Sequence, residues 1–141
     1  MPDEGTAVGA VDMDVLERIG ARLSGSRRFA EVTHRPAYAP NSVVADYDMG
    51  YFPAAVERAY IRISWFVTDD FNAHYSEQYE SGTLWECRWD RHPNEHNTRA
   101  HFHPPPDAAT PGSDAVYADD WREVLTRILA ELDERITSFW G

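Results

Sequence analysis

The sequence predicts an α+β fold: an antiparallel β-meander of about four strands, with an N-terminal helix before it and a long C-terminal helix packed on one face. Two observations predict this architecture. Apolar and polar residues alternate over Arg58–Asp90, which is the period of a half-buried strand. Over Trp121–Ile136 the apolar residues recur every three or four positions, as in an amphipathic helix. Because each pattern buries one side only, sheet and helix are expected to cover each other.

Residues 1–11 are small and acidic and predict a flexible tail, so one domain is expected over residues 12–141. A first helix is predicted to begin with Asp14 as N-cap, because Glu17 follows three residues later as in a capping box. Gly25 is expected to end this helix. Its apolar positions recur at helical spacing and are Val15, Leu16, Ile19 and Leu23.

Alternation predicts the strands of the meander in chain order. One strand is expected near Ser42–Asp48, a second over residues 61–67 and a third over residues 71–76, with a turn at Thr68–Asp70 between the last two. Ser81–Gly82 predicts a two-residue hairpin turn before the next strand. In that strand one side carries Trp85, Cys87 and Trp89, and the other carries Glu86, Arg88 and Asp90.

The final helix is expected to follow a cap at Asp119 or Asp120. Its apolar stripe consists of Trp121, Val124, Leu125, Ile128, Leu129, Leu132 and Ile136. We expect this stripe to be core rather than a partner-binding face. The sheet face that it covers should be the one bearing Ile61, Ile63, Trp65, Trp85 and Trp89.

The charge balance is unusual. The formal net charge is -11, and all 13 basic residues are arginines. An acidic, lysine-free surface predicts a protein of a halophilic cell, since concentrated salt screens the self-repulsion of acidic groups. The alternative is codon bias in a GC-rich organism. In either case the overall field repels nucleic acid and anionic membranes, so an anionic partner must meet a local basic patch.

No apolar run approaches the roughly 18 residues that a membrane span needs, and the N-terminus lacks a basic-then-apolar signal. A cytoplasmic location without membrane association is therefore expected. The single cysteine, Cys87, excludes an internal disulfide. Its place between two tryptophans predicts a buried thiol rather than a nucleophile.

The segment Arg88–His103 reverses the sign of the charge locally. Its arginines and histidines are Arg88, Arg91, Arg99, His92, His96, His101 and His103, and only Asp90 and Glu95 oppose them. Arginine pairs bidentately with phosphate, and histidine exchanges a proton near neutral pH. Together they supply the base, the acid and the cation that metal-free phosphodiester cleavage requires. On a strand the i,i+2 spacing places His101 and His103 on one side.

Two other interpretations of this segment stay open. The basic residues can simply neutralise carboxylates in an acidic protein. Alternatively, the histidines can bind a metal, because His92 and His96 would share a face if that turn were helical and His101 and His103 form a zinc-like pair on a strand. Pro93 in the turn argues against the helix.

The run Trp85–His103 contains Arg88-Trp89-Asp90, then His92-Pro93 and a closing His101-Phe102-His103. In these motifs the chain resembles the TumE-type toxin family, which has archaeal members, over about residues 60–106. Residues 1–55 are not covered by the resemblance, and the His-Trp pair that often precedes Arg-Trp-Asp in the family is absent. The resemblance implies the toxin of a type II toxin–antitoxin pair, acting on RNA and silenced by a DNA-binding antitoxin encoded nearby.

The leading hypothesis is a small metal-independent ribonuclease that needs no cofactor. Its predicted site divides the work among acid–base, orienting and binding groups. The catalytic set is His101, His103, Asp90 and His92; the substrate-binding set is Arg88, Arg91, Arg99 and Phe102. The alternatives are a non-enzymatic protein- or nucleotide-binding module with a His/Arg-rich loop, and a His-ligated metal-dependent hydrolase. RNA is the expected substrate, and homodimerisation is left open.

Overall fold

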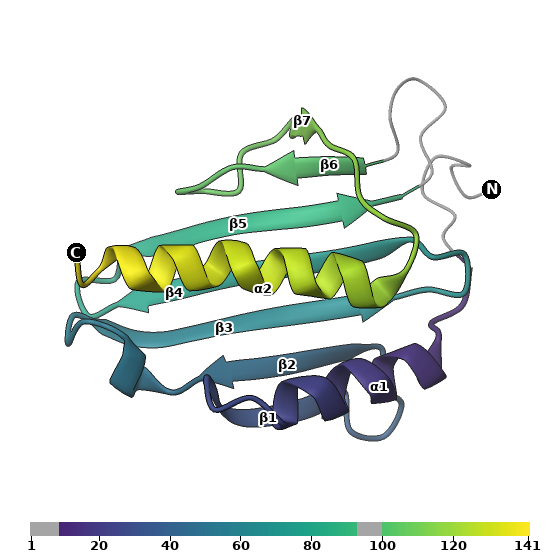
Figure 1. Cartoon of the computed structure of the whole chain (residues 1–141), viewed down its shortest axis with the longest axis horizontal. Coiled ribbons are helices and arrows are strands. Elements are labelled where there is room, and N and C mark those ends of the chain that lie inside the picture. The colour runs from purple at the N-terminus through teal and green to yellow at the C-terminus, as the bar shows by residue number, and fades with distance from the viewer. Residues whose placement is uncertain (1–8, 93–99) are drawn as a thin grey trace.

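Seven strands form one antiparallel sheet in the computed structural model, which describes residues 9–92 and 100–141. Each strand pairs with the one before it in the chain, so the sheet is a simple meander (Figure 1). The strands are β1 (Phe29–Arg35), β2 (Ser42–Tyr47), β3 (Val56–Trp65), β4 (Phe71–Tyr79), β5 (Leu84–Arg91), β6 (Ala100–His103) and β7 (Ser113–Asp114).

Both helices lie on the same face of the sheet (Figure 1). α1 (Met13–Ser24) packs against β1 and β2, and α2 (Trp121–Ser138) lies lengthwise over the middle strands. A short 3-10 turn, η2 (Met49–Tyr51), precedes β3. The core between sheet and helices includes Leu16, Ile19, Ala45, Ile61, Trp65, Tyr75, Cys87, Trp89, Val124, Ile128 and Leu132.

The predicted arrangement of the C-terminal helix is confirmed. The Arg135 guanidinium of α2 lies 3.7 Å from the centre of the Trp85 ring, and Trp89 Nε1 donates to Glu131 Oε2 at 3.1 Å. Trp65 and Ile63 line the same small apolar space as side chains from both helices. The three tryptophans of β3 and β5 therefore share the helix-covered face, as the alternation predicts.

The prediction of about four strands is wrong, because the sheet has seven. β1 is an edge strand without an alternating burial pattern, so the period-two signal is missing there. β6 has four residues and β7 has two, which is too short for any pattern to be detected. These strands are defined by backbone pairing with the adjacent strand, which leaves no period in the sequence.

The first helix begins two residues earlier than predicted. Its N-cap is Asp12, whose carboxylate accepts from Val15 N at 3.1 Å. Asp12 N in turn donates to Trp65 O at 2.9 Å, so the sheet holds this residue in the capping position. Asp14 instead forms an exposed ion pair with Arg18. Gly25 ends the helix as predicted.

The β4–β5 hairpin turn and the N-cap of α2 can also be compared with the sequence predictions. The hairpin between β4 and β5 is a three-residue loop, because Tyr79 N donates to Thr83 O at 2.9 Å, and not the predicted two-residue turn. Gly82 occupies its left-handed position at φ 88°, where a side chain would be strained. Asp120 is the cap of α2, accepting from Arg122 N at 2.9 Å.

Part of the predicted N-terminal tail is attached to the sheet. Val67 N donates to Ala10 O at 2.9 Å, and Val11 forms an antiparallel bridge with Phe66. Residues 1–8 lie outside the described part of the chain. No helix among the described residues is long and apolar enough to cross a membrane.

A buried charged group joins α2 to the sheet. Glu77 of β4 is 0% exposed, and it accepts from the Tyr75 hydroxyl at 2.6 Å and from Arg135 Nη2 at 2.8 Å. The Tyr79 hydroxyl donates to Oε1, the oxygen that also accepts from Arg135 Nη2, at 2.8 Å, and Arg135 Nε donates to Oε2 at 3.1 Å. Because each oxygen has several donors, the cost of burying the charge is offset within this cluster.

The sheet face that carries no helix is polar, and its side chains form rows across the strands. One row runs through Arg62, His74, Arg88 and His103, which are paired successively on β3, β4, β5 and β6. The neighbouring row runs through Ser64, Asn72, Asp90 and His101. Strand alternation therefore places the basic residues of four strands on one open face.

Candidate functional site

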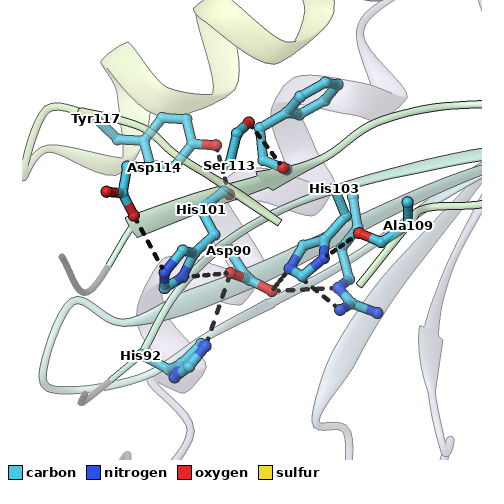
Figure 2. Close-up of polar contacts among 10 residues, drawn as sticks. Asp90, His92, His101, His103, Ala109, Ser113, Asp114 and Tyr117 are labelled. Atoms are coloured by element: carbon cyan, nitrogen blue, oxygen red, sulfur yellow. Dashed lines mark hydrogen bonds and ion pairs between the residues drawn. The ribbon is translucent and has the colours of Figure 1, made fainter. Parts of the chain in front are cut away.

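The site is built where β5 pairs with β6. Asp90 lies opposite His101 and Arg88 lies opposite His103, so all four side chains belong to the polar rows of the open face. Figure 2 shows the side chains of Asp90, His101 and His103 close together. The residues between them point the other way: Trp89 and Phe102 pack with ring centres 5.6 Å apart beside the core. The i,i+2 spacing in each strand thus produces a compact group of four polar side chains.

Asp90 is the centre of this group and is only 4% exposed. Its Oδ2 accepts from Arg88 Nε at 3.2 Å and lies 3.0 Å from His103 Nε2 (Figure 2). A buried carboxylate must be paired with cations or donors to be tolerated. The arginine and the histidine supply that pairing for one oxygen.

The ring of His103 is held on both sides. Nδ1 lies 3.0 Å from Ala109 O, and because a carbonyl oxygen only accepts, Nδ1 carries a proton. Nε2 stands between Arg88 Nη2, a donor at 3.2 Å, and the Asp90 carboxylate, an acceptor at 3.0 Å. This nitrogen can accept from the arginine when neutral and donate to the aspartate when protonated, so both protonation states have a partner.

The loop after β6 closes over this ring. A Cβ on Gly112 would lie 2.8 Å from Phe102 O and 3.0 Å from two atoms of the His103 ring. Only glycine therefore allows the loop to lie this close to the histidine. His103 is 6% exposed as a result.

The second oxygen of Asp90 faces two other histidines. Oδ1 lies 3.7 Å from His101 Nδ1 and 3.9 Å from His92 Nε2, too far for hydrogen bonds. It is buried and has no hydrogen-bond partner among the described residues. Within residues 9–92 and 100–141, Asp90, His92 and His101 form a group that could hold a metal ion, because each can offer a ligand atom within 4.8 Å of the others.

A groove of about 640 Å³ runs over the open face beside the cluster. Its lining includes Arg62, Asn72, His74, Arg88, Asp90 and His92. Only the rim of the cluster opens into it, since His101 and His103 are nearly buried. Arg62 and Arg88 give this groove positive charge within an acidic protein.

His74 lies in the groove between the two arginines. Burial lowers the pKa of His74 below its ordinary value, Arg88 and Arg62 lower it further, and Glu86, whose Oε2 is 3.1 Å away, opposes the shift. The neutral ring is therefore favoured here, unlike a typical surface histidine.

The structure brings together five of the eight residues predicted for the site, namely Arg88, Asp90, His92, His101 and His103. Arg99 lies outside the described residues, as do Pro93 and His96 of the metal hypothesis. Phe102 packs on Trp89 on the opposite face of the sheet, so it is separated from the cluster by the strand itself.

Arg91 is also directed away from the cluster. Its guanidinium donates to the carbonyl oxygens of Asp69 at 2.6 Å and Ala118 at 2.8 Å, over the Phe71 ring. It joins the β3–β4 turn to the segment before α2. Strand alternation in the sequence indicates this direction of the Arg91 side chain, because residues 89 and 91 lie on the same side of the strand and Trp89 is apolar.

Sequence reasoning missed three polar residues near the site: Arg62, His74 and Asp114. Arg62 and His74 lie in the same cross-strand row as Arg88. Their alternation with apolar residues in the sequence predicts that they lie on the polar face. Only the pairing register of β3, β4 and β5 shows that they lie beside Arg88. Asp114 Oδ1 lies 3.7 Å from His101 Nε2 and belongs to β7, which had no sequence signal.

Cys87 is a core thiol, as predicted. It is buried on the helix-covered face, and burial raises its pKa to about 12. The thiolate needed for a nucleophile is therefore disfavoured.

Fold and site together define a small α+β protein with a His/Arg/Asp cluster on the open face of a seven-stranded meander. The family model described as Toxin TumE matches residues 16–136. The chain belongs to the TumE toxin family, and this membership supports a toxin role. The match begins far before residue 60, so the resemblance extends over α1 and β1 as well. Comparison with curated proteins finds no match, and comparison with solved structures finds none either.

Proposed function

We propose that this toxin cleaves RNA without a metal ion, using the cluster of Arg88, Asp90, His101 and His103. The observation that carries the proposal is the placement of His103 Nε2 between Asp90 and Arg88, at 3.0 Å and 3.2 Å. A nitrogen with both an acceptor and a donor in reach can take up and release a proton without losing its orientation. A fixed orientation supports a role as general acid or base, which must also come within hydrogen-bond reach of the proton that it transfers.

The roles follow from the contacts of each side chain. Asp90 and the Ala109 carbonyl orient His103, which supports a role for His103 as the base that activates the attacking hydroxyl. His101 stands 6.4 Å from it, ring centre to ring centre, on the same face. It would protonate the leaving oxygen, while Arg88 would stabilise the developing charge on phosphate.

The groove supports a phosphodiester as the ligand. Two of its arginines, Arg62 and Arg88, come from separate strands and are spaced along the open face. A net charge of -11 gives no long-range attraction for RNA. Binding would therefore depend on short-range contacts from these arginines, which are stronger and less sensitive to salt than the overall field.

We further propose that the chain is the toxin of a type II pair in the cytoplasm. Its partner would be a DNA-binding antitoxin encoded beside it. The family membership supports the existence of an antitoxin. A protein that occupied the groove over Arg62 and His92 would block both the phosphate contacts and the cluster.

The test compares growth arrest and RNA cleavage by wild type, His101→Gln and His103→Gln at matched soluble expression. Loss of an acid or base group typically costs about 10²–10⁴ in rate, so both variants should lose cleavage and toxicity. His34→Gln is the matched control, because His34 lies on β1, at the opposite edge of the sheet from β6. Variants that cleave RNA as fast as wild type would contradict the acid–base roles. Growth arrest without cleavage would favour the binding module.

A further inference from the structure

We infer that Asp90, His92 and His101 form a binding site for one divalent transition-metal ion of the zinc class. The ligand atoms would be Asp90 Oδ1, His92 Nε2 and His101 Nδ1. The site shares Asp90 and His101 with the proposed acid–base cluster. A bound ion would therefore regulate the cleavage, a consequence that rests on the proposed function, whereas the binding does not.

The distances fit a zinc-type ion after a small contraction. Asp90 Oδ1 is 3.7 Å from His101 Nδ1 and 3.9 Å from His92 Nε2. Tetrahedral zinc with bonds of about 2.0–2.1 Å places its nitrogen and oxygen ligands about 3.3–3.5 Å apart. The required movement is a few tenths of an ångström for these two pairs, and the ligand atoms of the two histidines lie within 4.8 Å of each other. The His92 side chain is 41% exposed and can supply most of it.

The free oxygen of Asp90 is an independent indication of a ligand. The side chain is 6% exposed, and Oδ1 has no hydrogen-bond partner in the described part of the chain. A buried carboxylate oxygen without a partner loses its hydration and gains nothing in return. A cation between this oxygen and the two rings would remove that cost.

The surrounding contacts orient the ligands as in known metal sites. The other oxygen of Asp90 is held by Arg88 and His103, which fixes the carboxylate plane. If His101 binds through Nδ1, its Nε2 faces Asp114 Oδ1 at 3.7 Å, and a small movement of the exposed Asp114 side chain would complete a hydrogen bond. A carboxylate behind a ligating histidine is the usual outer-shell arrangement of zinc sites.

The ligand set also predicts what the ion does. Three protein ligands leave at least one position open, and His92 and Asp90 line the groove. A bound ion would occupy His101 Nδ1 and place a positive charge beside Asp90, so His101 could no longer donate a proton from that nitrogen. The metal-bound protein should therefore cleave RNA more slowly than the metal-free protein.

The experiment titrates the full chain, purified without a histidine tag and freed of metal with a chelator that is then removed. Zn²⁺ binding is measured by calorimetry, and Co²⁺ binding by its visible absorption, which reports tetrahedral coordination. The variants are His92→Gln, His101→Gln and Asp90→Asn, each checked for folding by circular dichroism. His92→Gln is decisive, since this half-exposed side chain can be changed without disturbing the core. His74→Gln is the control, a histidine on the same face outside the ligand set.

Wild type and His74→Gln should each bind one equivalent of Zn²⁺ or Co²⁺. Each ligand variant should lose more than the roughly 10–100-fold that follows loss of an outer-shell partner. Absence of saturable binding at one equivalent, or unchanged affinity in His92→Gln, would overturn the site.

RNA cleavage by the same samples separates this inference from the proposed function. Slower cleavage in the zinc-loaded wild type supports the inhibitory role, and unchanged cleavage overturns it. Cleavage that depends on added zinc would support the site but overturn both the inhibition and the metal-free mechanism. If neither form cleaves RNA, the proposed function fails while the binding data still decide the metal site.

Discussion

Asp90 pairs in register with His101 but makes its close contact with His103, the histidine diagonally across the two strands. Its Oδ2 lies 3.0 Å from His103 Nε2, whereas its Oδ1 stays 3.7 Å from His101 Nδ1. Each oxygen therefore faces a different ring, and only one of them is satisfied. The cluster is asymmetric for this reason, with one tightly held histidine and one that is free to meet a ligand or a proton.

The contact between Asp90 and His103 should appear as an energetic coupling. We expect a double-mutant cycle of Asp90→Asn and His103→Gln to give a coupling free energy of about 0.5–3 kcal/mol in urea unfolding, as for residues in one hydrogen-bond network. The same cycle with His34→Gln in place of His103→Gln should be additive, because His34 is on the far edge strand. Additivity between Asp90 and His103 would show that their contact contributes nothing to stability.

Glu77→Gln should destabilise the fold strongly. The change leaves the Arg135 guanidinium, whose side chain is 24% exposed, without its buried partner. Breaking a buried ion pair on one side costs about 3–5 kcal/mol, and partial exposure of the arginine favours the lower end. The control is Asp14→Asn, which breaks an exposed pair with Arg18 and should cost less than about 0.5 kcal/mol. Equal losses in the two variants would contradict the structural role of Glu77.

Acid should destabilise the wild type partly through His74. Burial holds the pKa of His74 below its ordinary value, so between these two pKa values the unfolded chain binds more protons than the folded one. The contribution of neutral His74 to the free energy of unfolding is fully present above about pH 6.5, the ordinary pKa of histidine. It is lost as the pH falls through the lower pKa that His74 has in the folded protein.

His74→Gln removes this titration while keeping a group that can donate to Glu86. Melting temperatures measured from about pH 7.5 to pH 5 and normalised to the highest pH should therefore fall less steeply in the variant than in wild type. Parallel curves would mean that protonation of His74 does not oppose folding.

Salt should stabilise the protein if its acidity is an adaptation. The chain carries a net charge of -11 without any lysine. Lowering salt from about 2 M to below about 0.2 M lengthens the Debye length from a few ångströms to nearly 8 Å, so repulsion between acidic groups returns. The melting temperature should drop over this range, and a neutral osmolyte at matched osmolarity should not replace the salt. A flat or rising melting temperature would leave codon bias as the explanation.

The sequence by itself determined the elements that bury one face. β3, β4, β5 and α2 each show a clear period, because burial selects apolar residues at every second or every third to fourth position. The same alternation separated Arg88 and Asp90 from Trp85 and Trp89. It also kept His101 and His103 together, since side-chain direction along a strand is a local property.

Only the tertiary structure decided the rest of the sheet and the membership of the site. β1, β6 and β7 are defined by their pairing with the adjacent strand rather than by a period of their own. The register that brings Arg62 and His74 level with Arg88 is likewise set by strand pairing. Asp12 caps α1 rather than Asp14 because its N–H reaches Trp65 O. Cross-strand neighbours depend on backbone hydrogen bonds between strands, and these bonds leave no periodic trace in the sequence.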